Sequence, residues 1–224
     1  MKDNLSAFDS TEYDLKIKQT LPYYEDFFDQ TAELVKTKYD GKISWLDVGC
    51  GTGKMGSIAL NDTDIDIGRF VFCDSSREMT DTACKRFKSD NTEFNVCDAR
   101  KLTYINEFDV VTAIQVFHYF DMKDRRTAVK NCYDALKENG SFITFENISP
   151  FTDIGTDIYL KRWERYQVRQ GKTPDEARKH IQRYGKDYFP ITINEHLKLM
   201  QDCGFKAVEI IWLSNMQAGV WGIK

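Results

Sequence analysis

Apolar side chains recur along this chain with two different spacings. In residues 15–35 they return every three or four positions, with an interruption at Pro22. This spacing predicts amphipathic helices on either side of the proline. We therefore expect residues 1–40 to form an amino-terminal helical cover.

From residue 43 onward, short apolar runs alternate with helical patterns. The runs predict buried strands at residues 43–48, 70–73, 94–97, 108–116 and 141–146. The patterns between them predict helices at residues 54–60, 79–87 and 125–136, the last closed by Asn139 and Gly140. Continuous apolar strands joined by helices are typical of a parallel sheet covered on both faces.

After Pro150 the pattern becomes more polar. Residues 153–170 and 174–184 predict two helices, the second opened by a capping Thr173 and by Glu176 three positions later. Another helix starts at Thr192, and residues 205–213 and 217–224 alternate as a closing antiparallel hairpin. The prediction is one α/β domain over residues 1–224. It is a Rossmann-like, doubly wound sheet of seven strands (five parallel strands plus a C-terminal antiparallel hairpin), with a helical lid insertion at residues 150–190.

Composition narrows the class of protein. A net charge of −4 argues against a surface built throughout for nucleic acid, although a local basic patch would be compatible with it. The six cysteines form no C-x-x-C pair and predict reduced core thiols. No apolar stretch approaches the ~20 residues that span a bilayer. We expect a cytoplasmic monomer or homodimer with no membrane segment and a small-molecule partner.

A glycine-rich loop follows the first predicted strand. Gly49, Gly51 and Gly53 lie between that strand and the next helix, where open α/β sheets bind ligands. Residues 51–56 also read as G-x-G-x-x-G, with Asp74 near the distance of a ribose-binding acid, so a dinucleotide is a competing ligand. A phosphate-binding P-loop is excluded, because its spacing of glycine, lysine and serine or threonine is missing.

Asp47 favours a different nucleotide. It lies within the first strand, two residues before Gly49, and its carboxylate is expected to face the ligand. At ~4 Å from a pyrophosphate it would cost about 1–4 kcal/mol. Beside an ammonium and a sulfonium the same charge is favourable. Asp47 is also hard to explain structurally, because an unpaired buried charge is costly. The loop therefore suits a cationic nucleoside.

Residues 45–53 resemble the first motif of class I S-adenosylmethionine-dependent methyltransferases, and the resemblance extends over residues 42–146. It implies S-adenosylmethionine as cofactor and S-adenosylhomocysteine as product, with Asp74 at the ribose and Asp98 at the adenine. The implied cofactor-binding set is Asp47, Gly49, Cys50, Gly51, Gly53, Asp74, Ser75, Met79, Asp98, Ala99 and Gln115. No metal site is predicted. The structural alternatives are helix capping for Asp74 and a turn role for Asp98.

The acceptor side is less defined by the sequence. His118 follows the fourth strand and is a candidate base, or else a packed, hydrogen-bonded rim histidine. The lid insertion is rich in arginine, and Arg162 or Arg183 could pair with a carboxylate on the acceptor, unless the basic face is only solvated surface. Tyr23 and Tyr24 are further candidates for acceptor binding.

A looser resemblance concerns residues 18–24 and 182–184, which are similar to carboxy-S-adenosylmethionine synthases. In that family a lid arginine pairs with a carboxylate, and Arg183 is the matching position. The glycine loop departs from the synthases at Gly51, Thr52 and Gly53. The principal hypothesis is thus methyl transfer to a small, carboxylate-bearing acceptor. The alternatives are a synthase-like enzyme, an NAD-dependent oxidoreductase and a non-catalytic nucleoside sensor.

Overall fold

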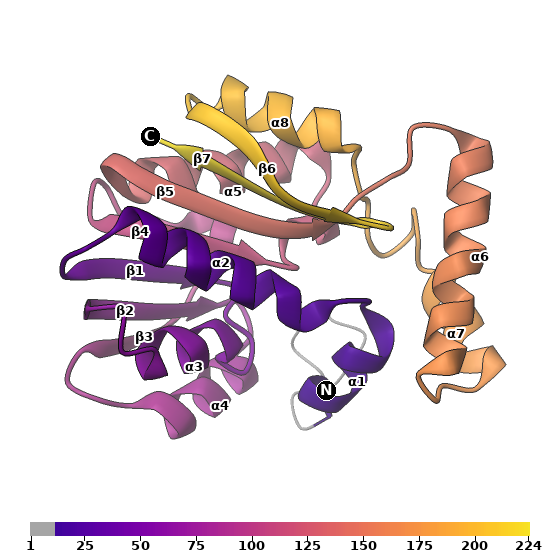
Figure 1. The fold of residues 1–224 in the computed structure, drawn as a ribbon, viewed down its shortest axis with the longest axis horizontal. Helices are drawn as coiled ribbons and strands as arrows, with labels where there is room; N and C mark the ends of the chain where they lie inside the picture. Colours follow the sequence, from indigo (N-terminus) through magenta and orange to yellow (C-terminus); the bar gives the residue numbers. More distant parts are fainter. Residues whose placement is uncertain (1–11) are drawn as a thin grey trace.

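The computed structural model describes residues 12–224 as a twisted sheet with helices on both faces (Figure 1). Its seven strands lie in the order β3-β2-β1-β4-β5-β7-β6. The strands are β1 (Ile43–Val48), β2 (Ile67–Asp74), β3 (Thr92–Val96), β4 (Phe108–Ile114), β5 (Leu136–Asn147), β6 (Lys206–Ser214) and β7 (Gln217–Ile223). The first five are parallel, whereas β7 is antiparallel to both β5 and β6. The predicted doubly wound sheet with a terminal hairpin is confirmed.

Two layers of helices cover this sheet. The helices are α1 (Tyr13–Thr20), α2 (Tyr24–Lys38), α3 (Lys54–Asn61), α4 (Arg77–Phe87), α5 (Met122–Ala135), α6 (Asp153–Arg169), α7 (Pro174–Ile181) and α8 (Ile193–Asp202). On one face, Phe27 of α2 and Met55 of α3 share an apolar core with Trp45. On the other face, side chains of α5 and α8 share a second core with Leu46, because successive strand residues point to opposite faces.

The structure corrects the predicted end of α5. Asn139 and Gly140 do not close this helix, which ends at Ala135, but lie inside β5. Leu136 pairs with Phe108 and Ser141 pairs with Val110, so residues 137–140 bulge out of the ladder. Asn139 lies in this bulge and has a positive φ of 62°. Turn residues within a strand were therefore mistaken for a helix end.

The amino-terminal helices and the lid segment (residues 150–190) meet at one end of the molecule. The chain breaks between α1 and α2 around Pro22, as predicted. Figure 1 shows α6 and α7 standing beyond the end of β5 and facing α1. Thr173 and Glu176 form the predicted capping box of α7, and Thr192 and Glu195 form that of α8. In residues 12–224 no helix is long and apolar enough to cross a membrane.

Candidate functional site

The glycine loop turns sharply between β1 and α3. Gly49 and Gly51 have φ values of 68° and 54°, a region that favours glycine. A Cβ on Gly49 would lie 2.4 Å from Cγ2 of Val116, whereas a Cβ on Gly51 would meet no atom within 4 Å. The first glycine therefore permits close packing on the loop after β4, and the second faces open space.

That open space is a cavity of about 280 Å³ at the carboxyl ends of β1 to β4. We call it the main cavity. Eight of the predicted cofactor residues line it: Gly49, Gly51, Asp74, Ser75, Met79, Asp98, Ala99 and Gln115. Its other lining residues are Tyr13, Val48, Cys97, Arg100, Ile114, Val116, Tyr119 and Phe120. The topology thus brings distant parts of the sequence to one hollow.

Asp74 ends β2 and fastens the glycine loop. One carboxylate oxygen accepts a hydrogen bond from the N–H of Gly51 at 2.9 Å, and the other accepts from the N–H of Ser76 at 2.8 Å. The residue that caps α4 is Ser76, whose hydroxyl accepts from the N–H of Met79. Helix capping therefore does not account for Asp74, whose carboxylate also lines the main cavity.

Asp98 is paired within its own turn. Its carboxylate accepts from the backbone N–H of Arg100 at 2.9 Å and also binds the Arg100 guanidinium. The hydrogen bond from the Arg100 side chain outweighs burial and lowers the pKa of Asp98. The turn role considered from the sequence is present, and Asp98 also lines the main cavity.

Asp47 is 3% exposed and lies beside the main cavity rather than in its wall. It accepts a hydrogen bond from Thr112 at 2.7 Å, and Thr112 accepts one from the indole N–H of Trp45 at 2.9 Å. Burial raises the pKa of Asp47 to about 7, with a smaller opposing effect from Thr112. Asp47 lines a small adjoining cavity together with Tyr24 and Cys50.

A second hollow adjoins the main cavity and contains residues that the sequence predicted for the acceptor side. We call it the acceptor-side cavity after that prediction. The two share Tyr13, Gln115 and Tyr119 as lining residues. The acceptor-side cavity of about 30 Å³ is also lined by Ile17, Thr20, Leu21, His118, Asn147, His180, Arg183 and Tyr188. It therefore brings the predicted base candidate together with one of the two predicted lid arginines.

His118 is held by Glu146 at the end of β5. Nδ1 of His118 lies 2.6 Å from Oε2 of Glu146, and both side chains are buried. Glu146 also accepts hydrogen bonds from the backbone N–H groups of Val116, Phe117 and His118. With a carboxylate at Nδ1, the neutral imidazole carries its proton there, which leaves Nε2 as the acceptor.

The charge state of Glu146 follows from these contacts. Burial alone would raise the pKa of its carboxyl, but the hydrogen bonds that it accepts from His118 and from the N–H of Phe117 hold the pKa below its usual value. Glu146 is therefore ionised and acts as a fixed anchor for the segment after β4. Such an arrangement orients a histidine toward a reacting group.

Arg183 reaches the acceptor-side cavity from the turn after α7. Its Nε donates to Asp187 at 2.8 Å, and its guanidinium lies 5.9 Å from the ring centroid of Tyr188. The lid segment contacts the loop after β4 at Phe189, because the N–H of Phe189 donates to the carbonyl of His118 at 2.6 Å.

Arg125 strengthens this junction. It is 1% exposed, and its guanidinium donates to the carbonyl oxygens of Phe117, Phe120 and Phe189. One buried side chain thus joins the His118 segment to the end of the lid.

Three predicted site residues line none of these cavities. Tyr23 is 56% exposed and lies edge-on to Trp212, and Arg162 lies on an exposed face of α6. Gly53 is the N-cap residue of α3, where an added Cβ would lie 2.6 Å from the ring of Phe87. The sequence features that suggested these residues were an aromatic pair, a basic stripe and a glycine motif. None of these features indicates how far a residue lies from a cavity.

Sequence reasoning missed several residues that line the cavities or support them: Tyr13, Arg100, Tyr119, Phe120, Glu146, Asn147, His180 and Tyr188. For Glu146 a signal was available, because an acid ending an apolar strand is what singled out Asp74 and Asp98. Tyr13 gave none, since it comes from a helix far away in sequence. Among residues 12–224, no three His, Cys, Asp or Glu side chains are grouped to hold a metal ion.

Comparison with known proteins agrees with this geometry. Residues 46–140 match a methyltransferase domain family. The carboxy-S-adenosyl-L-methionine synthase of Helicobacter hepaticus is 23% identical over 206 residues, covering 89% of this chain and 85% of that protein. The protein of the same name from Staphylococcus epidermidis is 20% identical and covers 96% of this chain and 93% of its own length.

Solved structures share the fold. A methyltransferase in complex with the Trm112 activator from Haloferax volcanii has a TM-score of 0.67 at 17% identity, covering 100% of this chain and 98% of that one. Magnesium protoporphyrin IX methyltransferase from Synechocystis, with bound S-adenosylhomocysteine, has a TM-score of 0.60 at 14% identity, covering 90% and 83%. Residues 46–140 of this chain thus match a methyltransferase domain, and its strand order and glycine loop belong to the fold that these solved methyltransferases share.

Proposed function

We propose that this protein transfers the methyl group of S-adenosylmethionine, bound in the main cavity, to a small carboxylate-bearing acceptor in the acceptor-side cavity. One observation carries the proposal: the two cavities share Tyr13, Gln115 and Tyr119. A donor in one and an acceptor in the other would meet at this common wall. Methyl transfer gains mainly from holding the two reactants close and aligned.

The acids at the strand ends support the cofactor's orientation. Asp74 would accept from the ribose hydroxyls, since it lines the main cavity and the N–H groups of Gly51 and Ser76 hold its carboxylate in place. Asp98 and Ala99 would lie at the adenine, and Asp47 with Gly49 and Gly51 near the methionine portion. The ionised form of Asp47 would attract the ammonium and sulfonium charges.

The acceptor-side residues support an anionic acceptor. Arg183 would pair with a carboxylate, because guanidinium binds carboxylates through two parallel hydrogen bonds. His118 would take a proton from the acceptor at Nε2, since Glu146 occupies Nδ1. Tyr188 lines the same cavity, and its hydroxyl is buried without a hydrogen-bond partner among the described residues, so it could donate to the acceptor.

A second candidate is a carboxy-S-adenosylmethionine synthase-like activity, in which the bond between the acid's carbon and its carboxyl group breaks and that group forms a new bond to the methyl carbon of the cofactor. The proton that this methyl carbon loses goes to the acid. This activity is favoured by the relatives of that name, which match this chain over nearly its whole length. Arg183 serves this candidate equally well, because the transferred group is itself a carboxylate. The two reactions differ in which molecule gains mass.

Incubation with S-adenosylmethionine and a panel of small carboxylic acids tests both candidates by mass spectrometry. Methyl transfer yields S-adenosylhomocysteine and a methylated acid. Synthase activity yields a carboxylated cofactor and no S-adenosylhomocysteine. Absence of both products with every acid would contradict the proposal.

The arginine has its own test. Arg183→Gln should raise the KM for the acid about tenfold or more while leaving the KM for the cofactor nearly unchanged, since one charge-assisted interaction is lost. Arg162→Gln is the matched control, because Arg162 lies exposed on α6. Equal effects of Arg183→Gln on both KM values would remove this arginine from acceptor recognition.

A further inference from the structure

Gln115 lies in the wall that the main cavity and the acceptor-side cavity share. It directly follows β4 and has a φ of 62°. This left-handed conformation is uncommon and costly for a residue other than glycine, and residues held in it cluster at functional sites. The backbone at this position therefore points to a role for the Gln115 side chain.

The amide group of Gln115 has a defined orientation. Its Nε2 donates to the carbonyl of Phe145 at 3.2 Å, and the backbone N–H of Gln115 donates to the same oxygen at 2.7 Å. Turning the amide over would bring Oε1 against this carbonyl, although neither oxygen has a hydrogen to donate. Oε1 therefore lies on the other side of the amide, where no residue of the described chain donates to it.

His118 provides a second acceptor at the same place. Glu146 holds the proton-bearing Nδ1, so Nε2 of the neutral imidazole is an acceptor. Gln115 and His118 both line the acceptor-side cavity, which has a volume of only about 30 Å³. So small a space brings both acceptors within reach of one polar group of a ligand.

On the basis of the methyl transfer proposed above, we further propose that the acceptor is a small amino acid methylated on its nitrogen, and that Gln115 determines this specificity. The amino group would donate to Oε1 of Gln115 and to Nε2 of His118, while the carboxylate pairs with Arg183. Both acceptors would repel a carboxylate, so the amino acid can bind in one direction only.

Nitrogen suits this pair of acceptors better than oxygen does. A hydroxyl group has one hydrogen to donate, whereas an ammonium group has three. A hydroxy acid would therefore leave one of the two acceptors unpaired, which is costly in a closed site. Tyr119 lies in the wall that the two cavities share, and aromatic rings attract ammonium groups.

The transfer step balances when His118 takes a proton. The ammonium group of the amino acid loses one proton to Nε2 of His118, and the nitrogen lone pair forms a bond to the methyl carbon. The bond between that carbon and the sulfonium breaks, and its electron pair goes to sulfur, which gives S-adenosylhomocysteine. The hydrogen bond to Gln115 persists and aligns the nitrogen with the methyl group.

Calorimetric titration of the protein saturated with S-adenosylhomocysteine measures this specificity. Propionate, lactate and alanine share a carbon skeleton and differ in one hydrogen, hydroxyl or amino group. Phenylacetate, mandelate and phenylglycine form a larger set of the same kind. In at least one set the amino acid should bind about tenfold more tightly than the other two, because it gains a charge-assisted hydrogen bond. With S-adenosylmethionine it should yield the N-methyl amino acid, which mass spectrometry detects.

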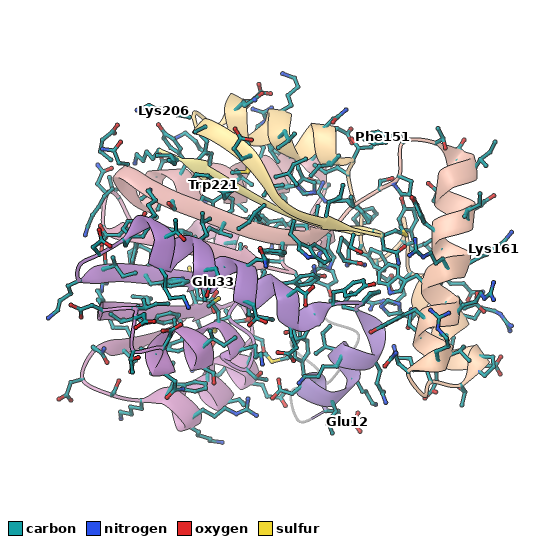
Figure 2. The ribbon with its side chains drawn as sticks, viewed as in Figure 1. Glu12, Glu33, Phe151, Lys161, Lys206 and Trp221 are labelled. Atoms are coloured by element: carbon teal, nitrogen blue, oxygen red, sulfur yellow. The ribbon has the colours of Figure 1, made fainter. Side chains whose placement is uncertain are left out.

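The Gln115→Gly variant removes the amide and introduces the residue that adopts a positive φ most readily. It should reduce the preference for the amino acid about tenfold and leave the affinity for S-adenosylhomocysteine nearly unchanged. Asn106→Gly is the matched control, because Asn106 has a φ of 54° and lies outside the two cavities. Lys161→Gln is a control in the lid segment, since Lys161 points outward from α6 (Figure 2). Circular dichroism confirms that each variant is folded.

The outcomes separate this proposal from the proposed methyl transfer. Tighter binding of the hydroxy acid, or equal binding within both sets, would overturn the amino-acid acceptor and leave methyl transfer to another acid standing. A preference that Gln115→Gly retains would overturn the role of Gln115, and a loss of S-adenosylhomocysteine binding alone would assign its amide to the cofactor instead. Absence of binding by all six acids would overturn both proposals.

Discussion

Asp74 combines two tasks in one carboxylate, since it fastens the glycine loop and lines the main cavity. Asp74→Ala should weaken binding of S-adenosylhomocysteine roughly tenfold to a hundredfold, because hydrogen bonds to a charged acceptor contribute about 1.5–3 kcal/mol. Isothermal calorimetry measures this change.

The fold should survive the substitution, as circular dichroism can show. Asp81→Ala provides the control, since Asp81 is an exposed acid on α4, the helix that follows β2. An affinity unchanged by Asp74→Ala would remove Asp74 from the cofactor site.

Asp47 should make cofactor binding depend on pH. Its pKa of about 7 leaves it largely protonated in mildly acidic solution. Since a cationic ligand favours the ionised form, the affinity for S-adenosylmethionine should rise by about tenfold per pH unit up to about pH 7 and then level off. Asp47→Asn should flatten this profile. A slope that persists in Asp47→Asn would assign the titration to another group.

The same carboxyl affects stability in the opposite direction. Its folded pKa is raised above the ordinary value of 3.8, so the folded protein binds more protons than the unfolded chain between about pH 4 and 7. Its contribution to the free energy of unfolding therefore falls as pH rises through this window. Bound cofactor should oppose that loss.

At the scale of elements, Arg125 joins the loop after β4 to the end of the lid. Arg125→Ala would remove a donor from three carbonyl groups, of which that of Phe117 still accepts from the N–H of Phe120. We expect the free energy of unfolding to fall by about 2 kcal/mol or more, because each unsatisfied buried group costs ~1–3 kcal/mol. Chemical denaturation measures it.

The adjacent residue supplies the comparison. Arg126 pairs with Asp202 on the surface at 3.1 Å, and exposed pairs of this kind contribute ~0–1 kcal/mol. Arg126→Ala should therefore have little effect. If both alanine variants lose the same stability, the buried carbonyl contacts do not account for the role of Arg125.

Elements were predictable where one local signal dominates. The capping residues Thr173 and Thr192 mark helix starts by chemistry that acts within four residues. The predicted end of α5 was wrong for the opposite reason, because the turn residue Asn139 lies in a bulge of β5 that is set by the pairing of β5 with β4. Long-range register overrides a local turn signal.

At the scale of the whole molecule, half of the residues lining the main cavity were predicted from the sequence, because strand ends of a parallel sheet converge. The acceptor-side cavity was predictable only in part. His118 and Arg183 carry sequence signals, but Tyr13 and Tyr188 reach the cavity through the packing of α1 and of the lid segment, which no local pattern specifies.

The stability that the intact protein gains when a ligand binds distinguishes S-adenosylmethionine from NAD as its cofactor. S-adenosylhomocysteine at a hundred times its Kd should add about 2.7 kcal/mol of stability. For a chain of this size that raises Tm by roughly 5–10 °C. NAD at the same concentration should leave Tm unchanged. Stabilisation by NAD alone would instead favour the oxidoreductase, and a sensor would bind S-adenosylmethionine without turnover.

The position of β7 has a consequence for association between chains. This strand lies between β5 and β6, yet it follows both of them in the sequence. Until β7 is in place, β6 has no neighbour to pair with and the edge of β5 stays open. An open edge is a template for association with other chains. A chain truncated after residue 216 should therefore aggregate far more than the chain that contains β7, as light scattering can show.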